Sequence, residues 1–193
     1  NYADPTTATA FSYMLGGHPM YQINFDEGSW LYDGSTGVIS EVRSFDITRH
    51  RGNIYAYYLQ QNMVGDYSNG KIYKLKHDVY SDNGDIITRI LRGKHVFDEN
   101  WNDVIVDRIE IFMETGVGLA TGQGSIPVAS LRISKDGGQT YGNSMFQEIG
   151  RIGEYLTRVL WRRLGIARDW IFEFTVTDPI KVVITDTDIK YRK

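Results

Sequence analysis

The four histidines are the first residues to consider for catalysis or metal binding, and their spacing supports neither. His18, His50, His77 and His95 lie far apart, with no pair at the close spacing that places two ligands on one helix face. The sequence has no cysteine, which excludes thiolate metal ligands, a cysteine nucleophile and disulfide bonds. No Gly-x-Ser-x-Gly nucleophile motif occurs either. We therefore expect no catalytic residue, no metal site and no cofactor.

Two other segments have compositions that could bind a phosphate or a cation. Residues 116–124 are rich in glycine and contain Gly-x-Gly spacing, but a phosphate loop needs a helix directly after it. Ser125-Ile126-Pro127 and a strand-like run follow instead, and no Gly-Lys-Ser/Thr is present. Residues 82–85 are acidic, yet they lack the ligand number and the closing glutamate of a calcium loop. We expect a structural loop and a turn.

The sharpest local motif is an Asp-box, Ser-x-Asp-x-Gly-x-Thr-aromatic, whose defined positions are Ser134, Asp136, Gly138, Thr140 and Tyr141. Its carboxylate is expected to accept hydrogen bonds from turn amides, and its glycine to adopt a backbone conformation that is costly for other residues. The ring of Tyr141 should pack beneath the turn. Such boxes are repeated in sialidases and other propellers, where they stabilise the fold away from the chemistry. One box therefore predicts a folding element rather than a catalytic site.

Arginine and tryptophan are concentrated between residues 151 and 170. Both residue types offer large contact areas and are common at the centres of interfaces. The phosphate backbone of a nucleic acid would suit them equally. The candidate residues for an interface with a subunit or with DNA are Arg158, Trp161, Arg162, Arg163 and Arg168.

The opposing interpretation is that these arginines form cross-strand salt bridges on a solvated sheet face. In a regular strand, alternation would place Arg163 on the same face as Val159 and Trp161, and Arg158 with Arg162 on the other face.

Composition describes a globular chain of 193 residues with 41% hydrophobic and 23% charged residues. The net charge of −3 gives no overall attraction to nucleic acid or to an anionic membrane. No apolar run approaches the ~20 residues of a membrane-spanning helix, so we expect no membrane insertion. The 13 Tyr and 20 Gly, with only 4 Pro, favour short twisted strands joined by tight turns.

Strand patterns occur nearly throughout the first half of the chain, and helix patterns are almost absent. The predicted strands are residues 20–25, 29–33, 38–42, 53–59, 63–67 and 71–76. Asn69-Gly70 and Asn83-Gly84 are typical of type I′ hairpin turns. A loose repeat at about 34 residues suggests two propeller blades, and a closed propeller needs at least about four. Because the chain also begins at Asn1 rather than Met, we expect further sequence upstream.

The strands lengthen beyond a boundary that we place near residue 88. The predicted strands there are residues 104–114, 127–134, 157–163, 171–177 and 180–185. Long strands with few helices favour two packed sheets. The expected fold is all-β, with partial β-propeller blades in residues 1–88 and a β-sandwich-like domain, including the Asp-box, in residues 89–193.

An ordered series of motifs extends through most of the chain. In the second half it comprises Gly116-Val117-Gly118, Gly122-Gln123-Gly124, the Asp-box, Gly150-x-x-Gly153-Glu154-Tyr155, residues 158–165, Arg168-Asp169 and Thr177-Asp178-Pro179-x-Lys181. In the first half it comprises Gly17-His18-Pro19, Trp30-x-Tyr32-Asp33, Val64-Gly65-Asp66-Tyr67 and Asp82-Asn83-Gly84. This series resembles the C-terminal part of the packaged-DNA stabilisation proteins of short-tailed bacteriophages, which are tail hub or nozzle proteins beneath the portal.

The resemblance implies a propeller-based subunit of the virion tail, assembled in the host cytoplasm into a homohexamer. Its partners would be portal or adaptor proteins, other tail components and packaged double-stranded DNA in the lumen. It implies no enzyme. The Asp-box and the 13 Tyr leave a second interpretation open, a carbohydrate-binding or sialidase-like propeller fragment. A nucleic-acid binder is a third, which the acidic total charge disfavours.

Overall fold

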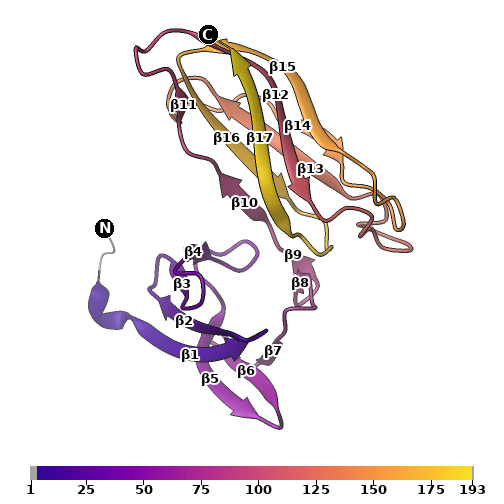
Figure 1. Cartoon of the computed structure of the whole chain (residues 1–193). Coiled ribbons are helices and arrows are strands. Elements are labelled where there is room, and N and C mark those ends of the chain that lie inside the picture. Colours follow the sequence, from indigo (N-terminus) through magenta and orange to yellow (C-terminus); the bar gives the residue numbers. More distant parts are fainter. Residues whose placement is uncertain (1–3, 193) are drawn as a thin grey trace. The chain divides into compact units, whose positions relative to one another are not determined.

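The computed structural model describes residues 4–192, and in this range the chain is built from strands. The described residues contain no α-helix, only a short 3-10 turn, η1 (Pro5–Thr7). They contain no helix long and apolar enough to cross a membrane. The chain divides into two compact units, Asn1–Asp85 and Ile86–Lys193 (Figure 1). We describe each unit by itself.

The first unit contains two antiparallel meanders in which each strand pairs with the next along the chain. The four-stranded sheet consists of β1 (Thr9–Leu15), β2 (His18–Asn24), β3 (Ser29–Asp33) and β4 (Ile39–Val42). The three-stranded sheet consists of β5 (Gly52–Tyr58), β6 (Gln61–Asp66) and β7 (Ile72–Leu75). A small hairpin of β8 (Ser81–Asp82) and β9 (Asp85–Ile86) follows.

The two Asn-Gly pairs form different turns. Asn83 and Gly84 have φ angles of 55° and 94°, so the type I′ prediction is confirmed there. The prediction is wrong for Asn69-Gly70, where neither residue has a positive φ. A longer loop than a two-residue turn connects β6 to β7 here, and side chains hydrogen-bond to its backbone. Asp66 Oδ1 accepts from the Ser68 amide at 2.8 Å, and Asn69 Oδ1 accepts from the Lys71 amide at 2.8 Å.

The interior of the first unit is largely polar. Gln22, Asn24 and Ser29 are buried on the four-stranded sheet. The side-chain amide of Asn24 donates from Nδ2 to the Gly52 carbonyl at 3.0 Å, and the backbone amide of His50 donates to Ser29 Oγ at 2.9 Å. Side-chain hydrogen bonds therefore join the first meander to the segment that starts the second. His50, a candidate functional residue by type alone, is part of this network.

The second unit consists of two facing sheets. One sheet has the order β10 (Arg89–Arg92), β16 (Asp169–Val176), β13 (Val128–Ser134) and β14 (Met145–Glu148), with β11 (Val96–Phe97) also paired to β16. The other has the order β15 (Val159–Ala167), β12 (Val104–Met113) and β17 (Ile184–Arg192). The hydrophobic core lies between them and includes Val106, Leu131, Phe174, Trp170 and Ile180. Each such side chain contributes roughly 1.5–3 kcal/mol through burial.

The last predicted strand was misplaced. Residues 180–185 were expected to be extended, but the strand is Ile184–Arg192, and Ile180 is a fully buried loop residue. β17 has charged residues at Asp186, Asp188 and Lys190, so it lacks an apolar pattern. Its pairing with β12 defines it, with Ile189 opposite Ile109. An edge strand of this kind is specified by its partner more than by its own side chains.

Candidate functional site

The turn after β13 is built around the carboxylate of Asp136. This group accepts hydrogen bonds from Ser134 Oγ at 2.6 Å, the Gln139 amide at 3.0 Å, and the amide and hydroxyl of Thr140 at 2.9 and 2.5 Å. These bonds hold the pKa of Asp136 well below its usual range, and the bond from Ser134 contributes most to this lowering. All hydrogen-bonding capacity of the carboxylate is therefore directed at its own turn.

The same turn packs on β16. Gly138 has φ +92°, and a Cβ there would lie 3.0 Å from Ile171 Cδ1, so the backbone covers this buried isoleucine closely. The Tyr141 ring lies on the outer sheet face, with the guanidinium carbon of Arg132 5.1 Å and that of Arg92 5.8 Å from its centroid. This arrangement braces β13 against β16 and presents no reactive group.

Both outer sheet faces contain a buried carboxylate clamped by arginine. Glu173 on β16 contacts Arg92 Nε at 2.7 Å and Arg132 Nη1 at 3.2 Å, in one row across three strands. On the other sheet, Glu110 accepts two hydrogen bonds from Arg158, at 2.6 and 2.5 Å. The bonds from Arg158 lower the pKa of Glu110. Removing an arginine would deprive a buried carboxylate of a counter-ion, whereas the arginines themselves are partly exposed.

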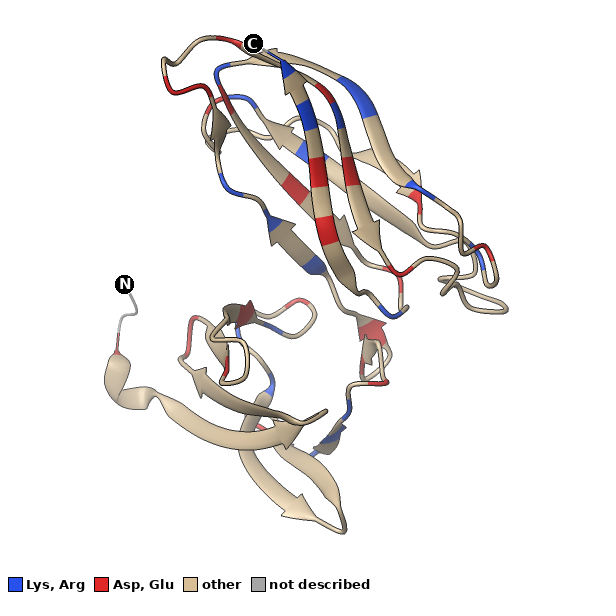
Figure 2. Cartoon of the chain, viewed as in Figure 1, with Lys and Arg blue, Asp and Glu red and all other residues tan. Residues whose placement is uncertain are grey.

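The arginines between residues 151 and 170 do not form one patch. Arg158 is engaged by Glu110, and Arg168 pairs with Asp103 at 3.3 Å. Arg162 and Arg163 are exposed and form no salt bridge with any residue between 4 and 192. Figure 2 shows acidic and basic residues interspersed along β12, which pairs with β15, and along β17, which pairs with β12. Cross-strand pairing thus accounts for part of the cluster. Arg162 and Arg163 form no ion pair within residues 4–192, although the charge of Arg162 contributes to lowering the pKa of Glu110.

Trp161 does not belong to the surface that we expected. Its side chain is 6% exposed, packs edge-to-face on Phe174, and donates from Nε1 to the Met145 carbonyl at 3.0 Å. It is a core residue whose polar atom is satisfied internally.

The alternation predicted for this strand is also wrong at Arg163. This residue has φ +59°, and the register to β12 shifts between Val106 and Arg108, which is a β-bulge. The extra residue turns Arg163 toward solvent and gives the inward position to Leu164. A bulge of this kind leaves no clear signature in the hydrophobic pattern.

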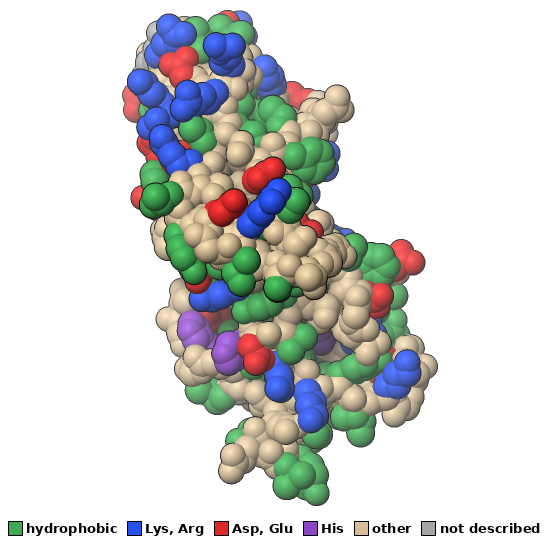
Figure 3. All heavy atoms as spheres, turned by 90° about the vertical axis from the view of Figure 1, so that its right-hand side faces the viewer, with side chains coloured by type: hydrophobic (Ala, Val, Ile, Leu, Met, Phe, Trp, Pro, Cys, Tyr) green, Lys and Arg blue, Asp and Glu red, His purple; other side chains and the backbone are tan. Residues whose placement is uncertain are grey.

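The loop between β14 and β15 presents large apolar side chains that we did not anticipate. Large hydrophobic residues reach the surface of both units (Figure 3), and in this loop Ile152, Tyr155 and Leu156 are exposed, Leu156 by 96%. We call residues 151–156 the apolar loop. Beside it lies a hollow of about 410 Å³ whose lining includes Phe112, Leu156 and Thr185.

The backbone of the apolar loop is hydrogen-bonded to the neighbouring segment, at Thr115 and Gly116. The Gly153 amide donates to the Gly116 carbonyl at 3.2 Å, and Thr115 Oγ1 donates to the Tyr155 carbonyl at 2.8 Å. Gly116 has φ +74°, and a Cβ there would lie 2.6 Å from the Tyr155 ring. The glycine-rich segment, predicted as a structural loop, is thus the support of the apolar loop. The closely spaced glycines of residues 116–124 are the sequence signal that could have indicated this supporting role.

The histidines and carboxylates of the described chain do not gather into a metal centre: no group of three or more potential ligands occurs between residues 4 and 192. His18 and His95 each contact one aspartate, at 2.8 Å from Asp33 and Asp169 respectively.

Residues 89–192, slightly more than half of the chain, match the family described as "Bacteriophage P22 Gp10, beta-sandwich". The matched range covers both sheets of the second unit. No curated protein matches the chain.

The chain belongs to this family and is a structural protein of a phage tail. Membership places it in the virion, in association with other virion components. The family's description confirms the predicted β-sandwich. Membership of the family also confirms the resemblance to phage tail proteins, at the level of a structural tail protein.

Proposed function

We propose that the chain is a hub or nozzle subunit that forms a ring below the portal, retains packaged DNA and serves as its ejection conduit. The family supports a structural role in the tail. The apolar loop is the observation that favours assembly through this unit, because its backbone is fixed while its large side chains face water. Exposed apolar patches on a rigid support are typical of surfaces that a partner covers.

The ring is proposed to contain six copies, each using its apolar loop against the next. In a cyclic ring the contact is heterologous, so the loop of one subunit meets a different surface of its neighbour. The two meanders of the first unit are proposed to be consecutive propeller blades, which their sequential antiparallel pairing supports. The role involves no catalytic step.

Contact with packaged DNA is assigned to Arg162 and Arg163. Both are exposed next to each other on β15 and have no salt-bridge partner within residues 4–192. Free guanidinium groups bind phosphates without reading sequence, and such binding weakens as salt concentration rises.

The test is tail assembly on DNA-filled heads with Leu156→Asp. A carboxylate in the contact should prevent ring formation, so electron microscopy should show heads without hubs, and genome retention should fall. Ile166→Asp is the matched control, because Ile166 is an exposed apolar residue on β15 outside the loop. Both variants are first shown by circular dichroism to fold as the wild type. Hubs at wild-type frequency with Leu156→Asp would then refute the assigned contact, and equal loss of hubs with Ile166→Asp would refute it too, because the effect would not be specific to the loop.

A further inference from the structure

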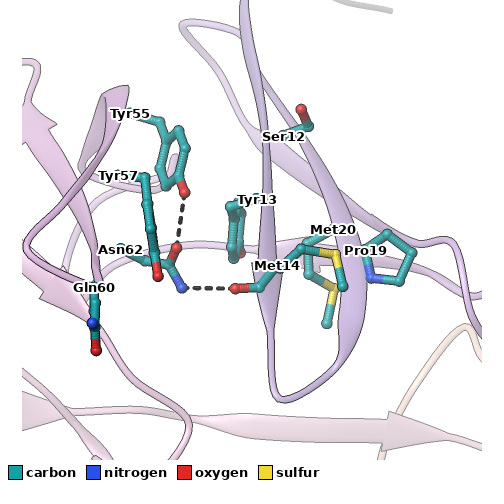
Figure 4. Close-up of a pocket in the computed structure, with 9 residues that line it drawn as sticks. All are labelled: Ser12, Tyr13, Met14, Pro19, Met20, Tyr55, Tyr57, Gln60 and Asn62. Atoms are coloured by element: carbon teal, nitrogen blue, oxygen red, sulfur yellow. Dashed lines mark hydrogen bonds between the residues drawn. The ribbon is translucent and has the colours of Figure 1, made fainter.

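Two hairpins of the first unit enclose an open groove of about 680 Å³, a volume typical of small-molecule sites (Figure 4). One wall comes from the β1–β2 hairpin and the other from the β5–β6 hairpin. The side chains that matter most for its chemistry are Tyr13, Met14, Met20, Tyr55, Tyr57 and Asn62.

One hydrogen bond joins the two walls of the groove, and a second fixes the side chain that makes it. Tyr55 Oη donates to Asn62 Oδ1 at 2.8 Å, and Asn62 Nδ2 donates to the Met14 carbonyl of the opposite hairpin at 2.7 Å (Figure 4). The Tyr13 and Tyr55 rings are 5.8 Å apart and tilted by 31°. A ligand would therefore enter a preformed site and would not need to order it first.

The hydroxyl of Tyr13 has no partner within residues 4–192, although the side chain is only 8% exposed. Burial raises the pKa of this phenol to about 12, so it is a neutral donor and acceptor at physiological pH. The hydroxyl oxygen is not one of the fully buried side-chain atoms without a hydrogen bond, so it is accessible to solvent. Because Tyr13 lines the groove, a bound ligand could take the place of water as the hydrogen-bond partner of this hydroxyl.

The groove contains no charged group. Its lining has hydroxyls, amides, thioethers and a proline, and β1 and β2 contain no Lys, Arg, Asp or Glu, as Figure 2 shows. A charged ligand would lose its hydration without gaining a counter-ion. Tyrosine rings provide rigid apolar faces beside polar tips, which suits ligands with apolar C–H faces and many hydroxyls.

We propose that this groove binds a neutral oligosaccharide, with Tyr57 stacking on a sugar ring and the Tyr13 hydroxyl bonding to a sugar hydroxyl. A peptide fits less well, because extended peptides are captured through free backbone groups of a sheet edge, whereas the polar groups of this groove are mainly side-chain hydroxyls and amides. The inference does not depend on the ring, since the groove lies within one unit of one chain.

The test is calorimetric titration of the full chain with neutral hexasaccharides of glucose, mannose, galactose or N-acetylglucosamine. Sialylated and sulfated oligosaccharides and an uncharged hexapeptide serve as comparisons. At least one neutral sugar should bind, with anionic sugars at least about tenfold weaker, because the groove offers them no cation.

Two variants locate the binding. Tyr57→Ala should lower the affinity about tenfold or more, and Tyr13→Phe, which removes only the hydroxyl, should lower it about three- to tenfold. Tyr58→Ala is the matched control, because Tyr58 is exposed by 61% beside Tyr57 at 65% but does not line the groove. Circular dichroism should show the same thermal midpoint for wild type and Tyr13→Phe.

The proposal is overturned if no neutral sugar binds, or if anionic sugars or the peptide bind as tightly as the best neutral sugar. It is also overturned if Tyr58→Ala reduces binding as much as Tyr57→Ala. It is equally overturned if Tyr13→Phe and Tyr57→Ala leave the affinity unchanged. None of these results affects the hub assignment, which is measured by assembly on heads.

Discussion

The environment of His50 shows how one buried residue links acidity to stability. Its Nδ1 lies 3.0 Å from both the Gly52 amide and Gln22 Nε2. The Gly52 amide can only donate, so Nδ1 accepts, and the neutral ring has its proton on Nε2. Burial is the main cause that lowers the pKa of His50. The positive charges of Arg51 and Arg49 lower this pKa further, whereas the negative charge of Asp82 raises it.

We therefore predict that the first unit loses stability in mild acid. Below the ordinary histidine pKa of about 6.5 the unfolded chain binds a proton that the folded chain excludes, so unfolding becomes easier as pH falls from about 7 to about 5. The contribution is fully present above that range. Denaturant unfolding at several pH values measures it. His50→Gln should flatten the pH dependence in this window, and an equal slope in the variant would contradict the assignment.

At the scale of elements, the glycines beneath the apolar loop allow a matched comparison. Gly116 and Gly122 both have left-handed φ angles, +74° and +79°, but only Gly116 faces a ring where a Cβ would be. Gly122→Ala should cost about 1–2 kcal/mol from backbone strain alone. Gly116→Ala should cost more, because Tyr155 must also move.

Chemical denaturation of both variants measures this difference. A larger loss for Gly116→Ala, together with impaired hub assembly, would tie the loop's geometry to its role. Equal losses would show that the Tyr155 ring is free to relax, and the loop would then be less rigid than its contacts indicate.

The strand pattern of the first unit could be predicted well where alternation and turn residues agree. Residues 29–33 were predicted as a strand and form β3, and the Asn83-Gly84 turn has the expected angles. β1 (Thr9–Leu15) was missed, because it is defined by pairing with β2 across Gly16-Gly17. Register shifts, such as the bulge at Arg163, depend on the partner strand and are not encoded locally.

The candidate site was predictable only in part. The carboxylate-centred turn at Asp136 follows from its local motif, since all its hydrogen bonds lie within seven residues. The surroundings of the clustered arginines did not follow, because arginine density does not distinguish Arg158, which is hydrogen-bonded to Glu110, from Arg162, which forms no salt bridge within residues 4–192. The apolar loop and the tyrosine groove required the fold, since each combines segments distant in the sequence.

At the scale of the whole molecule, the two units differ in how they are stabilised. The hydrophobic core cluster lies entirely within the second unit, whereas the first relies on the polar network around Gln22 and Asn24. We predict that residues 86–193 fold when produced alone. This fragment contains the exposed Trp101 and the buried Trp161 and Trp170. The buried pair should give blue-shifted fluorescence that moves to longer wavelength in one cooperative transition.

The full chain is the control for that experiment. It also contains Trp30, which is exposed and which the fragment lacks, so its emission should differ from that of the fragment only by the contribution of Trp30. A fragment with solvent-like emission in the absence of denaturant would contradict independent folding of the second unit.

The arginine clamps on Glu110 and Glu173 have one more consequence. Each clamp places an ion pair on the outer face of a sheet. Two molecules could therefore stack these faces only by dehydrating charged groups, which is costly. Association of copies through their sheet faces is thereby disfavoured. In the proposed ring, this would favour contacts away from the sheet faces over side-by-side growth into fibres.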